Sequence, residues 1–418
     1  MKKFLLILAV TVITINGIHA QSYQTFNSEL LGIIKNTKFR FGPFRLFPSF
    51  RLKDIGYDDN VYYSRDADKP ISDYTATLSP EIIGNVLFRD YLILSFTETP
   101  EYLFYVKQTG ERGWNHSFSP QARLLLFNRF VISGSYQYRN RKIRTTSEFG
   151  ARVRSIDKGY KASLFYETAR STSIGVTLST NEVSYADIVL PEERIRLASA
   201  LNRQENQGDF EFYYRIFSES FLFFKGSYTE HNFESRSSSW KDASAYTFSS
   251  GLRFPETGRL TGQFVLGYKK LIPKDIQRSG YSGLIGSTRI ELNIRRFRFR
   301  IDYQRDSQFS FWSSNFYFLE NSLRTGISFY VTSFLKLSYD FRYGENLYPE
   351  PVWLQLEDGS LFELDRKDIH RTHTFGFMIR IIRKTGIGLN MDLWDRSSNL
   401  YWAGRGRVFV GVSITHDF

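Results

Sequence analysis

The residues best spaced to do chemistry are charged side chains that recur at every second position of Ser287–Gln304. Arginine occupies positions 289, 298 and 300, and Glu291 and Asp302 alternate with them. Because successive side chains of a strand point to opposite faces, this period places all of these charges on one face. Such a row could select ions in a water-filled passage, or its members could neutralise one another as a structural ladder.

The same alternation continues into later stretches and predicts a charged lumen lining. Basic residues outnumber acidic ones in it, which favours an anionic solute or a polymer of sugar acids. The predicted lining comprises Arg289, Glu291, Arg298, Arg300, Asp302, Arg324, Lys336, Asp340, Arg342, Arg380 and Asp392.

No residues have the arrangement of a catalytic or metal centre. His370 and His373 are three residues apart, which on a strand directs them to opposite faces. The lipase-type serine elbow, the zinc-protease motif and a glycine-rich phosphate loop are all missing from the sequence. Three adjacent oxygen side chains at 58–60 lack calcium-loop spacing, so a turn or a lumen-facing polar cluster is the better interpretation. We expect no enzymatic activity, no cofactor and no metal.

The charged row is positioned by a predicted hairpin. Apolar residues from Thr288 to Ile294 and from Phe297 to Tyr303 alternate with the charges, and a two-residue turn at Arg295-Arg296 separates the stretches. This register places Ile294 opposite Phe297, Asn293 opposite Arg298, Glu291 opposite Arg300, and Arg289 opposite Asp302. Strands of this length suit a tilted membrane crossing, which needs about 9–11 residues. The apolar row is then expected to face lipid and the charged row to line the lumen.

Tight turns alternate with longer polar loops along the chain, which predicts an all-β, transmembrane, antiparallel up-and-down β-barrel over residues 44–418. About eighteen strands are expected, with sixteen as the alternative, from a first strand at Phe44–Tyr63 to a last at Arg405–Phe418. The tight turns, expected in the periplasm, are Arg89-Asp90, Asn128-Arg129, Arg170-Ser171, Phe217–Ser220, Pro255–Gly258, Arg295-Arg296, Val331–Ser333 and Arg383–Gly386. The loops, expected outside the cell, are Gln108–Gly113, Arg144–Asp157, Ala186–Asn206, Glu234–Asp242, Lys269–Tyr281, Asp306–Leu319, Gly344–Ile369 and Asp395–Gly404.

A second hairpin repeats the pattern. An apolar row from Leu335 to Tyr343 alternates with polar residues, and an odd-length turn at Val331–Ser333 joins it to the preceding strand. That turn predicts that Arg324 lies opposite Asp340.

The first 43 residues are expected to lie outside the barrel. Residues 1–20 have a basic start, a short apolar core and Ala20 at the end, as in a secretory signal peptide. Residues 21–43 predict a periplasmic segment with a short helix, ELLGIIK, capped by Asn27-Ser28. This segment is interpreted as a tether, with a lumen plug or a contact for a periplasmic partner as alternatives. Cysteine is missing, which excludes lipoprotein acylation and disulfides.

Composition fits a barrel better than a transmembrane helix or a nucleic-acid-binding protein. Mean hydropathy is −0.33, yet 17% of residues are aromatic, as lipid-facing rows and interfacial girdles require. Removal of Lys2 and Lys3 would lower the net charge from +12 to +10, which still favours anionic partners. Nucleic acid is not expected, because the arginines alternate along strands and no nucleic-acid-binding motif accompanies them.

The last predicted strand, RVFVGVSITHDF, carries alternating apolar residues and ends in Phe418. A final strand with a terminal aromatic residue resembles the signal that the bacterial outer-membrane assembly machinery recognises. Outer-membrane lipids and this machinery are therefore the expected partners, and the bacterial outer membrane is the expected location.

The chain resembles the outer-membrane barrels of the beta-barrel porin-2 type, which are associated with exopolysaccharide export operons. Three features carry the resemblance: Pro48, the stretch Gly56-Tyr57-Asp58-Asp59-Asn60-Val61-Tyr62, and Tyr74-Thr75-Ala76-Thr77-Leu78-Ser79-Pro80. The resemblance implies an export channel for polysaccharide, working with periplasmic export components, or for another polar anionic solute. A general diffusion porin is one alternative. The other is a structural or adhesive barrel with a closed lumen, whose function resides in the Gly344–Ile369 loop.

Overall fold

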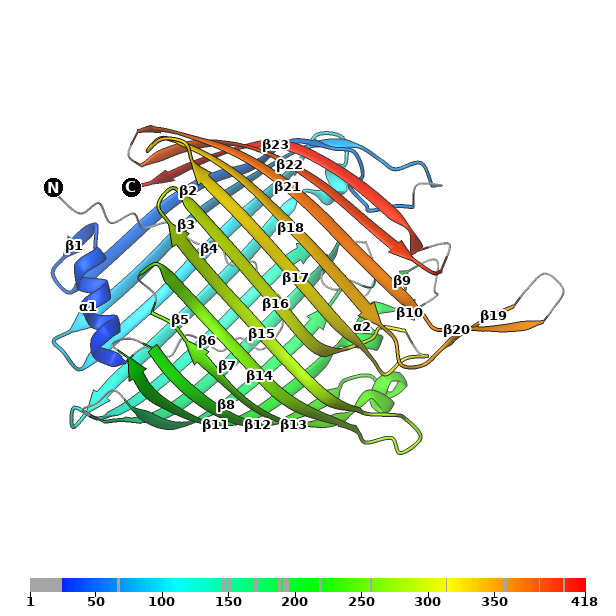
Figure 1. Ribbon diagram of the computed structural model, residues 1–418, viewed down its shortest axis with the longest axis horizontal. Coiled ribbons are helices and arrows are strands. Elements are labelled where there is room, and N and C mark those ends of the chain that lie inside the picture. The colour runs from blue at the N-terminus through cyan, green and yellow to red at the C-terminus, as the bar shows by residue number, and fades with distance from the viewer. Residues whose placement is uncertain are drawn as a thin grey trace.

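The computed structural model describes residues 25–65, 68–144, 148, 152–168, 172–186, 189–190, 195–217, 220–255, 258–312, 314–355, 360–382, 384–400 and 403–418. Within these residues, eighteen tilted antiparallel strands form one closed barrel, because β2 at one margin of the sheet pairs with β23 at the other (Figure 1). The predicted fold class and the count of eighteen are confirmed. The signal-peptide prediction for residues 1–20 lies outside the described part of the chain.

The barrel strands are β2 (Phe44–Asp58), β3 (Asp73–Phe88), β4 (Leu92–Tyr105), β5 (Gly113–Leu126), β6 (Phe130–Ile143), β7 (Val153–Glu167), β8 (Ser173–Tyr185), β11 (Arg203–Phe217), β12 (Ser220–Phe233), β13 (Ala243–Arg253), β14 (Leu260–Pro273), β15 (Tyr281–Ile294), β16 (Phe297–Phe309), β17 (Tyr317–Tyr330), β18 (Leu335–Leu347), β21 (Lys367–Ile382), β22 (Thr385–Ser398) and β23 (Arg405–Asp417). Each pairs with its neighbours in chain order. The remaining elements are α1 (Phe26–Asn36), β1 (Phe39–Phe41), the 3-10 helices Thr109–Glu111 and Arg236–Lys241, β9 (Val189–Leu190), β10 (Ile195–Arg196), α2 (Leu197–Leu201), β19 (Val352–Gln355) and β20 (Leu361–Leu364).

The two ends of the barrel differ, and we call them the tight-turn end and the loop end. The tight-turn end carries short connections such as Arg295-Arg296, where Arg295 adopts a left-handed φ of 52°. Helix α1 lies at this end, and the β19–β20 hairpin projects beyond the opposite one (Figure 1). The predicted turn at Arg170-Ser171 lies outside the described residues.

The register predicted for the first hairpin is confirmed at all four pairs, from Ile294 opposite Phe297 to Arg289 opposite Asp302. The register predicted for the second hairpin is wrong by two residues. Arg324 lies opposite Arg342 and Asp340 lies opposite Gly326, because the last pair before the turn is Tyr330 with Lys336. The turn is therefore longer than Val331–Ser333.

The first barrel strand ends earlier than predicted. β2 stops at Asp58 instead of Tyr63, because the next side chains turn the chain back onto β23. The carboxylate of Asp59 accepts a hydrogen bond from the backbone N–H of Val408 at 2.7 Å, and Asn60 bonds the backbone of Ser64 and Gly406. The interpretation of residues 58–60 as a turn with a polar cluster is thus confirmed.

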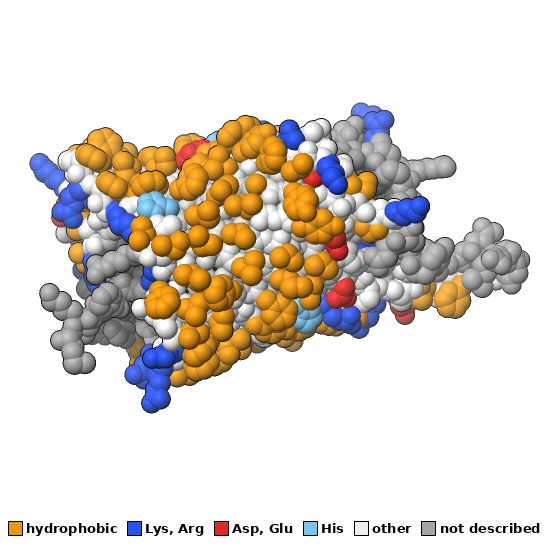
Figure 2. Space-filling view, turned by 90° about the horizontal axis from the view of Figure 1, so that it is seen from above, with side chains coloured by type: hydrophobic (Ala, Val, Ile, Leu, Met, Phe, Trp, Pro, Cys, Tyr) orange, Lys and Arg blue, Asp and Glu red, His pale blue; other side chains and the backbone are white. Residues whose placement is uncertain are grey.

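The outer surface is apolar around the middle of the barrel (Figure 2). Side chains such as Leu178, Phe248 and Leu284 are more than half exposed on it. Outward-facing tyrosines gather towards the loop end, at Tyr160, Tyr228, Tyr246 and Tyr268. A closed barrel with an apolar band and aromatic girdles has the architecture of proteins that span the bacterial outer membrane. No helix within the described residues is long and apolar enough to cross a membrane.

Candidate functional site

The predicted charged row lies on the inner face of β15, β16, β17, β18, β21 and β22. Each member alternates with an outward apolar residue, as Arg300 does between the exposed Phe299 and Ile301. Register continuity across neighbouring strands then places the acidic members Asp302, Asp340 and Asp392 on the same face. The structure therefore brings all eleven predicted residues together along one wall.

Ion pairs link part of this wall, which we call the charged ladder. Arg289 and Arg300 both contact Asp302, at 3.0 and 2.6 Å between nitrogen and oxygen. Arg298 lies 3.2 Å from Glu291. Arg324 reaches Asp340 diagonally at 3.0 Å although the two are not directly opposed. The structural interpretation of the row thus holds for these pairs.

Three cations of the ladder lack such pairing. Lys336, Arg342 and Arg380 form no ion pair and no side-chain hydrogen bond with any residue that the structure describes. Seven of the eleven ladder residues are basic and four are acidic, so these residues together carry an excess of positive charge, while Asp306 and Glu320 lie on the same inner face nearer the loop end. An unbalanced charge that faces water attracts anions into the space beside it.

The opposite wall combines ion pairs, such as Lys53–Glu101 and Arg141–Asp157, with uncharged hydrogen-bonding groups. Strands β3, β4, β6 and β7 lie about half of the ring away from the ladder. Ser133 and Ser163 contact each other at 2.5 Å across one strand pair, and Ser95 donates to Asn85 at 2.7 Å across another. The hydroxyl and amide groups of this wall can bond the polar groups of a solute.

Helix α1 lies at the tight-turn end and packs against the inner wall. Phe26 is 0% exposed and Leu30 is 7% exposed. They belong to one apolar cluster with inward side chains of eight strands, namely Leu87, Ile93, Leu125, Val131, Phe165, Tyr213, Phe223 and Val265. The helix therefore fills part of this mouth, beside the half of the barrel between β3 and β14.

Polar contacts hold α1 in this position. The carboxylate of Glu29 forms an ion pair with Arg123 of β5, and the Phe26 N–H donates to the carboxylate of Glu167 at 3.3 Å. The helix begins one turn earlier than predicted, because Thr25 caps it by accepting a hydrogen bond from Ser28 N–H. Asn27 and Ser28, the predicted caps, lie within the helix.

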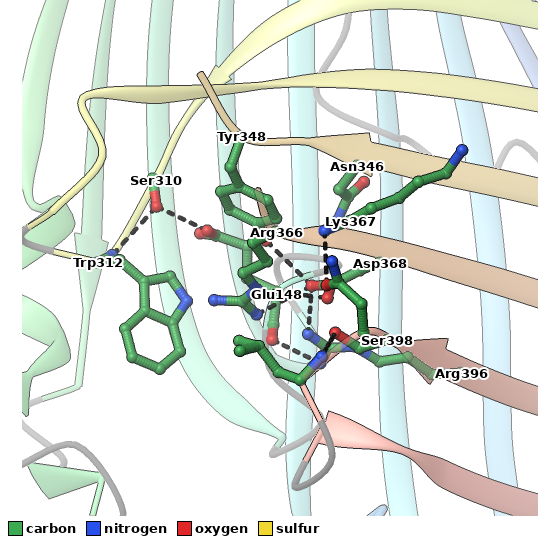
Figure 3. A network of polar contacts seen from close by, with 12 residues as sticks. Glu148, Ser310, Trp312, Asn346, Tyr348, Arg366, Lys367, Asp368, Arg396 and Ser398 are labelled. Carbon is green, nitrogen blue, oxygen red and sulfur yellow. Dashed lines mark hydrogen bonds and ion pairs between the residues drawn. The ribbon is translucent and has the colours of Figure 1, made fainter. Parts of the chain in front are cut away.

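The loop end is crossed by a buried polar network (Figure 3). Asp368 is bound by Arg366 at 2.9 Å and by Arg396 at 2.6 Å, and all three are nearly inaccessible. Arg396 also donates to the backbone oxygen of Glu148, which lies between β6 and β7. The contact joins segments from distant parts of the ring.

Glu148 extends this network to a third segment. Its carboxylate accepts hydrogen bonds from the Ser310 hydroxyl at 2.6 Å and from the Phe311 N–H at 2.8 Å. Lys241 donates to the backbone oxygens of Ser310 at 2.6 Å and Ala200 at 3.2 Å. Burial raises the pKa of the Glu148 carboxyl and lowers the pKa of Lys241 to about 8. Four connections at the loop end are thus tied together by two buried charges.

The raised pKa of Glu148 predicts that its contact strengthens in acid. The Glu148 carboxyl binds its proton more tightly in the folded protein than in the unfolded chain. Protonation therefore stabilises the folded state, and this stabilisation is fully present below the unfolded pKa of about 4.5. It is lost as pH rises through the higher folded value. Amide hydrogen exchange at the loop end, corrected for intrinsic rates, should slow as pH falls from 7 to 4. Glu148→Gln should flatten this dependence.

The exposed loop residue Glu363 provides the matched control, because Glu363→Gln removes a carboxylate that has no buried contact. A wild-type profile that Glu148→Gln leaves unchanged would contradict the assignment.

The sequence did not identify Glu148, Lys241, Arg366, Asp368 and Arg396 as partners. No local pattern marks them, since they lie in irregular connections or at strand ends. The histidine prediction is confirmed: His370 lies inward beside Asn346, and His373 lies outward against the Tyr339 hydroxyl at 2.9 Å. Phe418 packs edge-on against His416 on the outer face, and its role in assembly stays a prediction.

No family model matches this chain, and no curated protein matches it either, so the resemblance to the beta-barrel porin-2 type stays a prediction. Solved structures with a similar course of the chain are outer-membrane proteins. OpdK of Pseudomonas aeruginosa is 11% identical, with 89% of this chain and 99% of that chain covered and a TM-score of 0.47. OpdO of the same organism is 10% identical, with 89% and 97% covered and a TM-score of 0.48. The P. aeruginosa siderophore receptor PirA is 10% identical, with 90% and 80% covered and a TM-score of 0.45.

Proposed function

We propose that this protein is a channel of the bacterial outer membrane that passes polar anionic solutes, including acidic polysaccharide. The observation that carries the proposal is the excess of positive charge among the eleven ladder residues, where Lys336, Arg342 and Arg380 form no ion pair with a carboxylate of the described residues. Anions gain favourable electrostatic energy along such a wall, whereas cations are repelled. The hydroxyl-rich wall across the lumen suits the hydroxyl groups of a sugar.

A second candidate is a barrel that is closed at rest. It is favoured by α1 at the tight-turn end and by the network of Asp368 and Glu148 at the loop end. Both features place side chains across a mouth of the barrel. A transport channel with a closed resting state would combine the two candidates.

The native chain in a planar bilayer tests the proposal. Under a tenfold gradient of potassium chloride, we expect a reversal potential displaced towards the chloride equilibrium potential. Glucuronate in place of chloride should still carry current, because its carboxylate meets the same wall. A reversal potential displaced towards the potassium value would refute the anion channel. The second candidate predicts currents that appear only after α1 is displaced.

A further inference from the structure

Four inward side chains on consecutive strands form a cluster at the tight-turn end, which we call the mouth cluster. Its members are Arg298 of β16, Tyr330 of β17, Lys336 of β18 and Arg380 of β21. Each lies within three residues of a tight turn. They occupy the side of the mouth that α1 leaves uncovered, because the apolar cluster around Phe26 and Leu30 involves strands only from β3 to β14.

The register brings these side chains next to one another. Tyr330 lies directly opposite Lys336, and the guanidinium of Arg298 lies 5.8 Å from the Tyr330 ring centre. Arg380 lies one step diagonally from Lys336, because its N–H donates to the Phe334 carbonyl at 2.7 Å while Lys336 opposes Met378. Diagonal inward neighbours on adjacent strands are about 7–8 Å apart or less, within reach of long side chains.

The cluster carries three cations, and one carboxylate, that of Glu291, lies beside it. Glu291 pairs with Arg298 at 3.2 Å, whereas Lys336 and Arg380 have no such partner among the described residues. Like charges on neighbouring strands destabilise a sheet. The buried hydroxyl of Tyr330 also lacks a hydrogen-bond partner in this part of the chain. The neighbouring ladder pairs avoid both the repulsion between like charges and the unsatisfied hydroxyl. A local loss of stability of this kind is characteristic of a functional site.

Small residues leave room beside the cluster. The inward positions level with Arg298 on the next three strands are Ser328, Ser338 and Gly376, which oppose one another. The next row towards the middle of the barrel contains Arg300, Gly326, Asp340 and Thr374. An anion with several oxygen atoms would therefore meet donors at the mouth and small side chains beside them, before it reaches the row of Asp340.

We propose that the mouth cluster binds the carboxylate or phosphate group of a solute at the tight-turn end of the lumen. Lys336 and Arg380 supply charge-assisted hydrogen bonds to its oxygen atoms. This site deepens the proposed function, because it gives the anion channel a capture point at one mouth. In the orientation expected from the short turns, that mouth faces the periplasm.

Calorimetric titration of the full refolded chain in detergent tests the site without any need for current. The probes are glucuronate and inorganic phosphate at constant ionic strength. We expect saturable binding that weakens at least about tenfold in Lys336→Gln/Arg380→Gln and that persists in Lys336→Arg/Arg380→Lys. The matched control, Lys158→Gln/Lys274→Gln, removes the same charge from residues paired with Glu182 and Glu230 and should bind normally.

The outcomes separate the site from the channel. Absence of saturable binding, or equal binding by Lys336→Gln/Arg380→Gln, overturns the mouth cluster even if the currents prefer anions. Competition by phosphatidylglycerol would identify a lipid headgroup as the occupant and would overturn a solute site. Cation-preferring currents together with normal phosphate binding would refute the channel proposal but not this site. Heat-modified migration on gels verifies that each variant is folded.

Discussion

Replacing Phe26 and Leu30 with aspartate should open the barrel at its tight-turn end. Both side chains are buried against the inner wall, and together they join α1 to a cluster from eight strands. Aspartate in that apolar cluster would be desolvated without a partner, so the seated position of α1 would lose its advantage. In a planar bilayer, the double variant should show longer open times and a larger unitary conductance than the native chain.

The expected effect is large because the two side chains supply most of the apolar contact of α1. Burying a phenylalanine and a leucine stabilises the seated helix by about 3–6 kcal/mol. Losing this contribution would shift the ratio of closed to open barrels by roughly two to four powers of ten. The single Glu29–Arg123 ion pair is not expected to compensate for such a loss, because the cost of removing both charges from water offsets much of their attraction.

The other face of α1 offers a matched control. Leu31 is 65% exposed and Ile34 is 40% exposed, so Leu31→Asp/Ile34→Asp adds the same charge to the same helix without touching the cluster. This variant should conduct like the native chain. Equal conductance in both double variants would contradict a plug.

A reversible cross-link sharpens the test. The chain has no cysteine, so Glu29→Cys/Arg123→Cys introduces the only two thiols, at residues whose side chains touch. A short bifunctional maleimide with a cleavable spacer should hold α1 in the mouth and suppress conductance. Cleavage of the spacer should restore it. Unchanged current after complete cross-linking would show that ions pass α1 in its seated position.

The sequence predicts the barrel wall well because each strand repeats a local pattern. Alternation between one apolar and one polar face requires only the period of a strand, and the Arg295-Arg296 turn fixes one complete register. The Arg324 register was missed by two residues, because turn length cannot be read from alternation when a longer turn preserves the faces. The diagonal Arg324–Asp340 contact kept the predicted partners together despite this error.

The two ends of the barrel could not be predicted in the same way. Glu148 and Arg396 are 248 residues apart, and neither has a neighbour that marks the contact. The position of α1 depends on inward residues of eight strands, which meet only after the barrel closes. Predicting it would require the three-dimensional arrangement of the inner face, whereas the wall requires only neighbouring residues.

Exchanging two arginines in the middle of the ladder for glutamate should reverse the ion preference of the channel. Arg300 and Arg342 lie on the inner wall near Asp302, Asp340 and Arg324, and Arg342 has no ion-pair partner among the described residues. Arg300→Glu/Arg342→Glu changes the net charge of the ladder by four, from an excess of basic to an excess of acidic groups. At about 8 Å and an effective dielectric constant of about 40, each unit charge changes an ion's energy by roughly 1 kcal/mol. The permeability ratio of chloride to potassium should therefore fall by well over about tenfold, which reversal potentials measure directly.

The position of the exchanged charges, and not their number, should decide this result. Lys107→Glu/Arg236→Glu changes the net charge by the same amount at exposed residues of the loop end, where bulk water and salt screen them. That control should keep the anion preference. Raising the salt concentration should reduce the shift in reversal potential caused by the ladder exchange. The reduction should be smaller than for any shift caused by the control, because the lumen contains less water and salt than the bulk. If both exchanges shift the reversal potential equally, selectivity arises from the net charge of the whole protein and the ladder has no specific role. If only the ladder exchange shifts the reversal potential, the anions pass along β16 and β18. They then pass beside the charged ladder, whose acidic residues neutralise only part of its positive charge.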